Sequence, residues 1–187
     1  MGSSTIPLML TALFKIPLAL RVGQMLSDEE LQALERAEAL ENAHERALRF
    51  LEARPRSSAE VKQHLFKKKI AAEVIDQAIT RLTDAGLLDD AAFAKYWVEN
   101  REQFRPRAGR ALRFELKRKG VADAAIGDAL GEIDETESAY RAVEHRAQRW
   151  HALERREFFE KVAAFLVRRG FAYDIAKHTA KRLWDER

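Results

Sequence analysis

The chain has 187 residues, of which 47% are hydrophobic and 34% are charged, so it is long enough to bury a core. Its eight glycines and four prolines are too few for a turn-rich sandwich or barrel. It contains no cysteine, which excludes disulfides and thiolate metal sites and fits a reducing cytoplasm. The net charge of +3 is only mildly basic, so the distribution of charge carries more information than its sum.

The first residues form an apolar leader. Thr5 to Leu26 is strongly apolar, but it is interrupted by Pro7, Lys15, Pro17 and Arg21. A membrane span needs about 20 apolar residues without central charges, and a signal peptide needs basic residues before its apolar stretch, which residues 1–10 lack. We predict a strand-like or poorly ordered leader that packs on the first helices, with an interfacial membrane anchor as the alternative. Residues 1–42 comprise this leader and a lead-in helix, or two short ones, opening at Ser27.

Three internal repeats follow. Three segments align without gaps at spacings of 51 and then 50 residues: Val61–Ile70, Leu112–Val121 and Val162–Phe171. The register continues through two further triplets, Val74, Ala125, Ile175 and Leu82, Ile133, Leu183. Such periods indicate stacked repeats. We therefore predict an all-α protein of three tandem three-helix units (43–88, 89–135 and 136–187) in an elongated array. The triplets Leu65, Leu116, Leu166 and Leu82, Ile133, Leu183 should be buried.

Helix ends are marked at repeated places. Ser57 with Glu60 has the pattern of a capping box, and Asp90 can cap the next helix. Gly120 and Gly170 are expected to be C-terminal caps in the left-handed region. Lys69 occupies the matching place in the first unit, where a residue other than glycine costs roughly 1 kcal/mol if the geometry is the same. The first turn therefore either differs or carries this cost.

Charge is segregated within the middle unit. Arg101–Lys119 holds eight Lys or Arg and two Glu, whereas Gly120–Tyr140 holds six Asp or Glu and neither Lys nor Arg. One interpretation is a positive surface for a polyanion. The other is that the two segments pair with each other.

The middle unit also predicts a basic helix face. At 100° per residue, the side chains opposite Leu112 are Arg107, Arg110, Arg113, Lys117 and Arg118. Phe114 falls inside this arc, where it can stack on a base, fill a groove of a partner, or pack on a neighbouring repeat. Arg101 and Arg105 lie just before, in an Arg-rich segment around Pro106 that suits phosphates or carboxylates, or is simply solvated.

Pairs of cations recur at one repeat position. The pairs are Lys67–Lys68, Arg118–Lys119 and Arg168–Arg169, in the last turn of each middle helix. The helix dipole favours cations there by about 0.3–1 kcal/mol each. A binding role is the second interpretation, since stacked repeats can align the pairs on one surface.

Catalytic constellations are missing from the sequence. It has no P-loop glycine run and no His-Glu-x-x-His motif. Helix capping explains Asp89 and Asp90 better than a metal-dependent nuclease does. We expect no enzymatic activity, no cofactor and no metal.

Four stretches together resemble the RecX family, which regulates the bacterial recombinase RecA. They are Ala47–Ser58, Gly86–Ala94, Gly109–Gly120 and Phe165–Tyr173, in a resemblance that runs from about Ala43 to Trp184. Lys69 departs from the usual glycine. The resemblance implies tandem three-helix units that lie in the groove of a RecA–DNA filament and inhibit ATP hydrolysis and strand exchange. It also implies a cytoplasmic protein of recombination, DNA repair and the SOS response.

The leading hypothesis is a non-enzymatic, monomeric regulator that binds RecA and the filament of RecA on single-stranded DNA, with weaker binding to DNA alone. The alternative is a general DNA-binding helical module, similar to a helix-turn-helix, which would bind bare DNA tightly and with strong salt dependence. A third is a helical scaffold without nucleic acid. The predicted contact residues are those of the basic face, the Arg-rich segment and the cation pairs.

Overall fold

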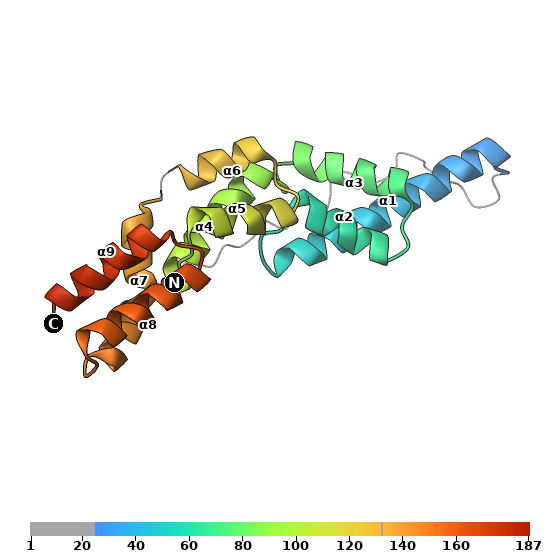
Figure 1. Ribbon diagram of the computed structural model, residues 1–187. Helices are drawn as coiled ribbons and strands as arrows, with labels where there is room; N and C mark the ends of the chain where they lie inside the picture. Colours follow the sequence, from blue (N-terminus) through green and yellow to red (C-terminus); the bar gives the residue numbers. More distant parts are fainter. Residues whose placement is uncertain (1–24, 132) are drawn as a thin grey trace, which may run out of the picture.

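The computed structural model describes residues 25–131 and 133–187, and in these residues it contains nine α-helices, one short 3-10 helix and no strand (Figure 1). Unit 1 consists of α1 (Asp28–Glu52), α2 (Ser58–Lys67) and α3 (Ala72–Asp84). Unit 2 consists of α4 (Asp90–Phe104), α5 (Gly109–Arg118) and α6 (Asp123–Leu130). Unit 3 consists of α7 (Glu135–Ala147), the 3-10 helix η2 (Gln148–Trp150), α8 (Arg155–Arg168) and α9 (Tyr173–Asp185). The all-helical prediction is confirmed, while the predicted leader falls largely on residues 1–24, outside the described residues.

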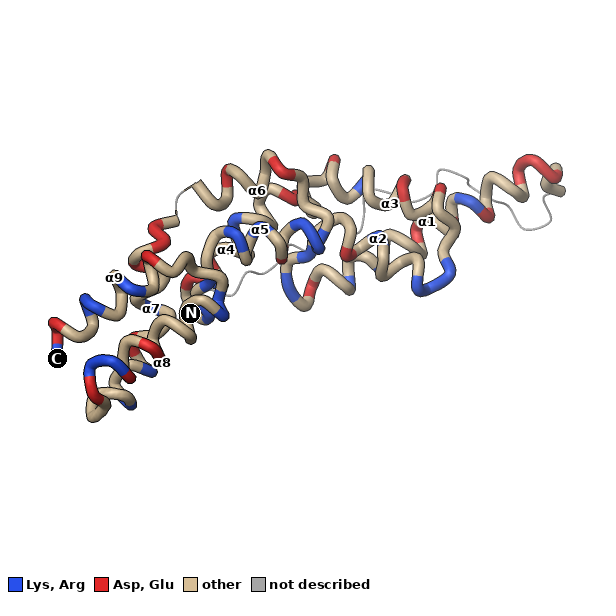
Figure 2. Tube along the Cα trace, viewed as in Figure 1, with Lys and Arg blue, Asp and Glu red and all other residues tan. Residues whose placement is uncertain are grey.

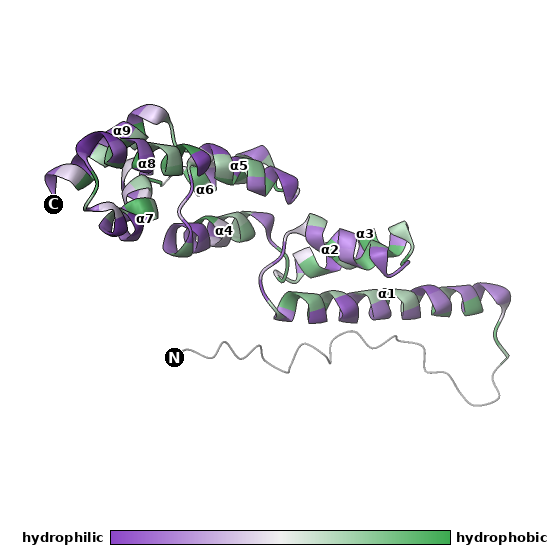
Figure 3. Cartoon of the chain, turned by 60° about the horizontal axis from the view of Figure 1, so that its bottom comes forward, coloured by the Kyte–Doolittle hydropathy of each residue, from purple (hydrophilic) through white to green (hydrophobic). Residues whose placement is uncertain are grey.

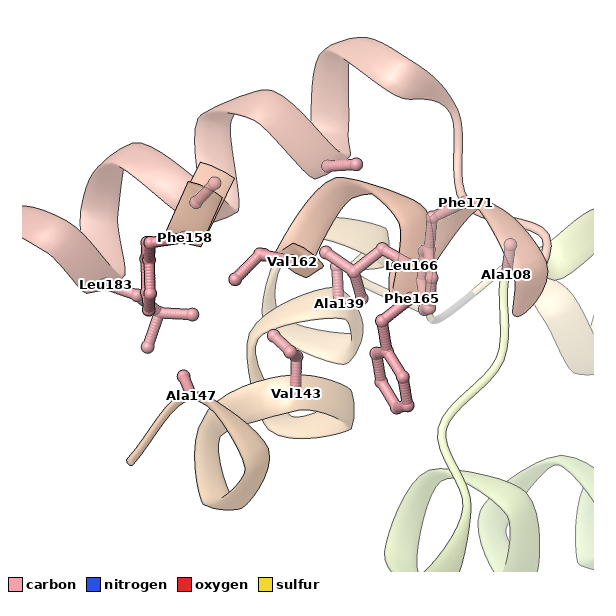
Figure 4. Close-up of a cluster of buried hydrophobic side chains, with 12 residues drawn as sticks. Ala108, Ala139, Val143, Ala147, Phe158, Val162, Phe165, Leu166, Phe171 and Leu183 are labelled. Carbon is pink, nitrogen blue, oxygen red and sulfur yellow. The ribbon is translucent and has the colours of Figure 1, made fainter. Parts of the chain in front are cut away.

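Each unit has its own apolar core. Unit 1 is centred on Leu65 and Leu82, unit 2 on Leu112 and Ile126, and unit 3 on Phe158. Figure 4 shows the core of unit 3, where side chains of α7, α8 and α9 converge. The extensive helix–helix contacts fall within units. Stability therefore resides mainly in three small cores that are joined end to end.

The repeat register is confirmed by burial. Leu65, Leu116 and Leu166 are fully buried. In the second triplet Leu82 and Leu183 are buried, whereas Ile133 is half-buried against the core of unit 2. Ile133 differs because α6 ends at Leu130, while α3 and α9 continue through the matching position.

The lead-in is one continuous helix. Ser27 and Glu30 form the expected capping box at its start. Ala43 and Ala47 are its buried residues, so α1 packs on α2 and α3 through its C-terminal half. The helix therefore runs unbroken across the predicted boundary between 42 and 43.

The three turns after the second helices share one geometry. Lys69, Gly120 and Gly170 have φ of 60°, 76° and 98°, all in the left-handed region. In each turn the next N–H donates back to the buried leucine carbonyl, as Val121 does to Leu116 at 3.2 Å. This is the bonding pattern of a Schellman cap. Gly120 and Gly170 are thus confirmed as caps, and Lys69 keeps the same turn at a backbone cost.

The units follow one another as an elongated array. In Figure 1 unit 1 lies on the right, unit 2 in the middle and unit 3 on the left. In the turned view of Figure 3, α1, α4 and α7 lie along the lower side, and the other two helices of each unit lie above them. The second and third helices of all units therefore share one face of the array.

Candidate functional site

Five exposed side chains on α5 form a surface that we call the α5 basic face: Arg110, Arg113, Phe114, Lys117 and Arg118. Figure 2 shows the concentration of Lys and Arg on and around this helix. Phe114 is 64% exposed, and the Arg118 guanidinium lies 5.9 Å from its ring centroid. Of the interpretations left open for Phe114, packing on a neighbouring repeat does not fit this exposure.

Two arginines of the predicted site face Glu115 instead. Arg101 Nε and Arg107 Nη1 each lie 2.9 Å from a different oxygen of Glu115, and Trp97 Nε1 donates to Glu115 at 2.8 Å. Arg107 therefore lies off the basic arc, because α5 begins only at Gly109 and the helical angle does not apply before it. Arg105 follows the end of α4 and is exposed.

Lys119 lies in the contact between units 1 and 2, which we call the first joint. Its carbonyl accepts a hydrogen bond from Ser57 Oγ at 2.6 Å, and its Nζ lies 2.9 Å from Glu60 Oε1. The same ammonium lies 4.2 Å from the Trp97 ring centroid. Burial alone would raise the pKa of Glu60, but hydrogen bonds from Arg54, Lys119 and the Ser57 N–H lower it to about 2.

Arg169 occupies the equivalent place between units 2 and 3, the second joint. Its Nη1 donates to the Pro106 carbonyl at 3.0 Å, and its guanidinium lies 4.7 Å from the Phe165 ring centroid. Burial, together with the neighbouring Arg107, Arg146 and Arg105, lowers the pKa of Arg169. Across the same joint, Arg110 Nε donates to the Gly170 carbonyl.

The cation pairs thus divide into two roles. The first members, Lys67, Arg118 and Arg168, are exposed at the ends of their helices. The second members in units 2 and 3 are held in the joints, whereas Lys68 remains exposed. The position alone therefore does not align all six cations on one surface.

Asp89 and Asp90 correct one expectation. Asp89, not Asp90, caps α4, accepting from the N–H groups of Ala91 and Ala92. Asp90 is the first helical residue, and it accepts from the Ser58 N–H at 2.8 Å across the first joint. Sequence spacing placed the cap one residue late because either carboxylate satisfies the pattern.

The acidic segment pairs with the basic one at three places. Asp123 Oδ1 lies 3.0 Å from Lys117 Nζ and 3.8 Å from Arg113 Nη1. Glu135 accepts from the Gly109 N–H at 2.7 Å. Arg110 and Arg118 keep their exposed positions on the α5 basic face, so neutralisation of this surface is incomplete.

Exposed apolar side chains on the outer units were not predicted from the sequence. Phe66 is 71% exposed, Tyr173 68% and Val167 42%. The repeat alignment could have predicted the exposure of Phe66 and Val167, because both occupy the repeat position of Lys117, which was predicted to lie on an exposed helix face.

The described residues were searched for clusters of metal-binding side chains and for membrane-spanning helices. In residues 25–131 and 133–187 no group of three or more His, Cys, Asp or Glu could hold a metal ion. No helix in these residues is long and apolar enough to cross a bilayer.

Comparisons with known proteins agree with the three-unit organisation. Family models described as the first, second and third three-helix domains of RecX match residues 43–82, 89–130 and 132–179. Proteins named "Regulatory protein RecX" are similar: that of Streptomyces coelicolor is 32% identical, covering 79% of this chain and 80% of its own, and that of Geobacillus kaustophilus is 34% identical, covering 83% and 59%. The crystal structure of RecX from Lactobacillus salivarius has a TM-score of 0.68 at 25% identity, covering 79% of this chain and 97% of that one.

Proposed function

The chain belongs to the RecX family of regulatory proteins, and from that premise we propose that it binds the RecA recombinase and the RecA filament on single-stranded DNA, inhibiting ATP hydrolysis and strand exchange without chemistry of its own. The proposed setting is the bacterial cytoplasm, in recombination, DNA repair and the SOS response. The proposal centres on the α5 basic face and keeps the other predicted contact residues as candidates: Arg101, Arg105, Arg107, Lys119, Lys67, Lys68, Arg168 and Arg169.

The α5 basic face is the observation that carries the proposal. Its cations are exposed together with Phe114 on the middle unit of an elongated array. Exposed guanidinium and ammonium groups suit phosphates and carboxylates. An exposed aromatic ring among cations adds a surface for a base or an apolar side chain. A filament of protein on DNA presents both kinds of group to one elongated ligand.

The direct test measures RecA ATPase activity on single-stranded DNA while this protein is titrated in. We expect inhibition by the wild-type protein and at least a tenfold loss of potency for Arg113→Glu with Arg118→Glu. This pair leaves the ion pair between Lys117 and Asp123 intact. It also spares Arg110, whose side chain bonds to Gly170 in the second joint.

A matched control carries the same change of charge on α1. Arg36→Glu with Arg46→Glu alters two exposed arginines whose side-chain hydrogen bonds lie within that helix, and it should inhibit like the wild type. The α1 variant should melt like the wild-type protein, since exposed substitutions usually change stability by less than about 0.5 kcal/mol. The α5 variant should stay folded but lose about 1 kcal/mol, because Arg118→Glu places a carboxylate at the helix C-terminus and Arg113→Glu removes a cation near Asp123. Full inhibition by a folded α5 variant would contradict the proposed role of this face.

Binding to bare DNA separates the alternative. A general DNA-binding module would bind DNA without RecA, and its affinity would fall steeply with salt. Our proposal expects much tighter binding to the RecA–DNA filament than to either component. Measuring both affinities over a salt series decides between them.

A further inference from the structure

Four arginines from both sides of the second joint form a group that we call the second-joint cluster: Arg105, Arg107, Arg146 and Arg169. Arg105 and Arg107 flank Pro106 in the segment between α4 and α5 of unit 2, and Arg146 lies in the last turn of α7 in unit 3. With burial, the charges of these three lower the pKa of Arg169. Cations that face one another in this way favour the binding of an anion between them.

Contacts across the joint fix the positions of these arginines. Arg169 Nη1 donates to the Pro106 carbonyl at 3.0 Å, and the Arg169 carbonyl accepts from the Ala108 N–H at 3.4 Å. The ring of Phe165, which is buried in the core of unit 3 (Figure 4), lies 4.7 Å from the guanidinium carbon of Arg169 and 5.0 Å from that of Arg146. One ring therefore holds two guanidinium groups of unit 3 beside the Pro106 segment of unit 2.

Carboxylates neutralise only part of the second-joint cluster. Arg107 pairs with one oxygen of Glu115, but the other oxygen of that carboxylate pairs with Arg101. Among the described residues, the other three members of the cluster form no ion pair with a carboxylate. The cluster therefore keeps an excess of positive charge.

The ordinary explanation for cations at these positions is the helix dipole. Arg105 and Arg169 are the C-caps of α4 and α8, and Arg146 lies in the last turn of α7, so the dipole favours a cation at each place. This effect acts on each helix end separately. It does not account for three such ends, from two units, that meet at one joint.

Arg169 also has hydrogen-bond donors to spare. A guanidinium group carries five N–H donors, and within the described part of the chain only one donor of Arg169 has an acceptor. None of its nitrogens is buried without a partner, so solvent reaches the remaining donors. Guanidinium groups with free donors bind phosphate oxygens in pairs.

We propose that the second-joint cluster binds phosphate groups, and that a bound phosphate bridges unit 2 and unit 3. Arg105 would contribute from unit 2, and Arg146 and Arg169 from unit 3, so that one oxyanion offsets the repulsion among them. Binding needs no partner protein, so this inference goes beyond the proposed function and does not depend on it. Phosphate groups can come from a free polyphosphate or from a nucleic-acid strand, and the test separates these two sources.

Calorimetric titration of the whole chain with tripolyphosphate and with a short oligothymidylate, at constant ionic strength, tests the site. We expect Arg105→Gln with Arg146→Gln, which alters two exposed side chains, to weaken binding of the tighter ligand at least tenfold. The control, Arg155→Gln with Arg156→Gln, removes the same charge from exposed positions at the opposite end of α8 and should bind like the wild type.

The order of the two affinities assigns the source of the phosphate. Tighter binding of tripolyphosphate indicates a free polyphosphate, and tighter binding of oligothymidylate indicates a nucleic-acid strand. Equal affinities of the two double variants, or no binding of either ligand by the wild-type protein, would overturn the inference. The predicted inhibition of RecA would stand in both cases, because it rests on the α5 basic face.

Amide hydrogen exchange tests the bridge between the units. The Ala108 N–H donates to the Arg169 carbonyl across the second joint, and the Ser58 N–H donates to Asp90 at 2.8 Å across the first. Saturation with the tighter ligand should slow exchange at Ala108 at least threefold and leave Ser58 unchanged. The same ligand should have no effect at Ala108 in the variant that lacks Arg105 and Arg146. Unchanged exchange at Ala108, or equal slowing at both joints, would overturn the bridge.

Discussion

At the scale of single residues, one turn is used three times under different constraints. A Cβ on Gly120 would lie 2.5 Å from Ala59 Cβ, and one on Gly170 would lie 3.0 Å from Ala111 Cβ. These glycines therefore supply a left-handed turn and also let the helix of the preceding unit approach. Lys69 needs only the turn, because no unit precedes it among the described residues.

Gly120→Ala should destabilise the protein more than Gly86→Ala. Both positions have positive φ, which costs an alanine about 1–2 kcal/mol, but a Cβ on Gly86 meets nothing within 4 Å. The contact with Ala59 adds to the cost only at Gly120. Urea unfolding measures the free energy of unfolding of both variants. Equal losses would show that the first joint accommodates the added Cβ without a loss of stability.

Glu60 should make stability depend on pH in acid. Its pKa in the fold is about 2 against an ordinary value of 4.5, so the unfolded chain binds the proton first as pH falls. Its contribution is complete above about pH 4.5 and is lost progressively towards pH 2. We expect Glu60→Gln to cost about 1–3 kcal/mol at pH 7 by leaving Lys119 without its carboxylate. The difference in free energy of unfolding between the wild-type protein and Glu60→Gln, measured in urea, should become smaller below pH 4.5. A difference that does not change with pH would contradict this prediction.

At the scale of elements, α5 combines a structural role with the proposed binding role, and only Arg110 of the α5 basic face also takes part in a joint. Its start enters the second joint, where Ala108 contributes to the core of unit 3 (Figure 4). Its middle buries Leu112 and Leu116 in unit 2, and its outer side forms the α5 basic face. Substitutions on the outer side can therefore report on binding without disturbing either core.

Phe114→Ala is expected to weaken RecA inhibition severalfold while leaving the melting temperature unchanged. The ring is 64% exposed and belongs to none of the three cores, so its removal leaves no cavity. ATPase titration and thermal unfolding on one preparation separate the two effects. A loss of a few kcal/mol in stability would place the ring in packing instead.

Periodicity predicted the helical units better than it predicted where the candidate side chains lie. The repeat of Leu65, Leu116 and Leu166 located the units because burial imposes the same spacing in each. Helical angles misplaced Arg107, since the helix start is set by the second joint, which no local pattern reveals. The positions of Lys119 and Arg169 in the joints could not be predicted for the same reason. Their contacts with Ser57 and Pro106 join residues about 60 positions apart in the chain.

At the scale of the whole molecule, three cores with limited contacts between them should not unfold as one. Leu166→Ala removes a fully buried side chain from unit 3 and should cost about 2–5 kcal/mol there. Native-state hydrogen exchange should then accelerate in α7, α8 and α9 far more than in α2 and α3. Equal acceleration across all three units would indicate a single cooperative domain.

The head-to-tail joints bring unlike surfaces of neighbouring units together. Each joint sets the start of one unit's second helix against the glycine turn of the next, which is a heterologous contact. At the free turn of unit 1, Lys69 presents a Cβ and a cationic chain where Gly120 and Gly170 admit a neighbouring helix. At the other end, α8 begins at Arg155, before the position that matches the start of α2. The ends of the described array are thus unlike its joints, because Lys69 keeps a strained turn where both joints have a glycine.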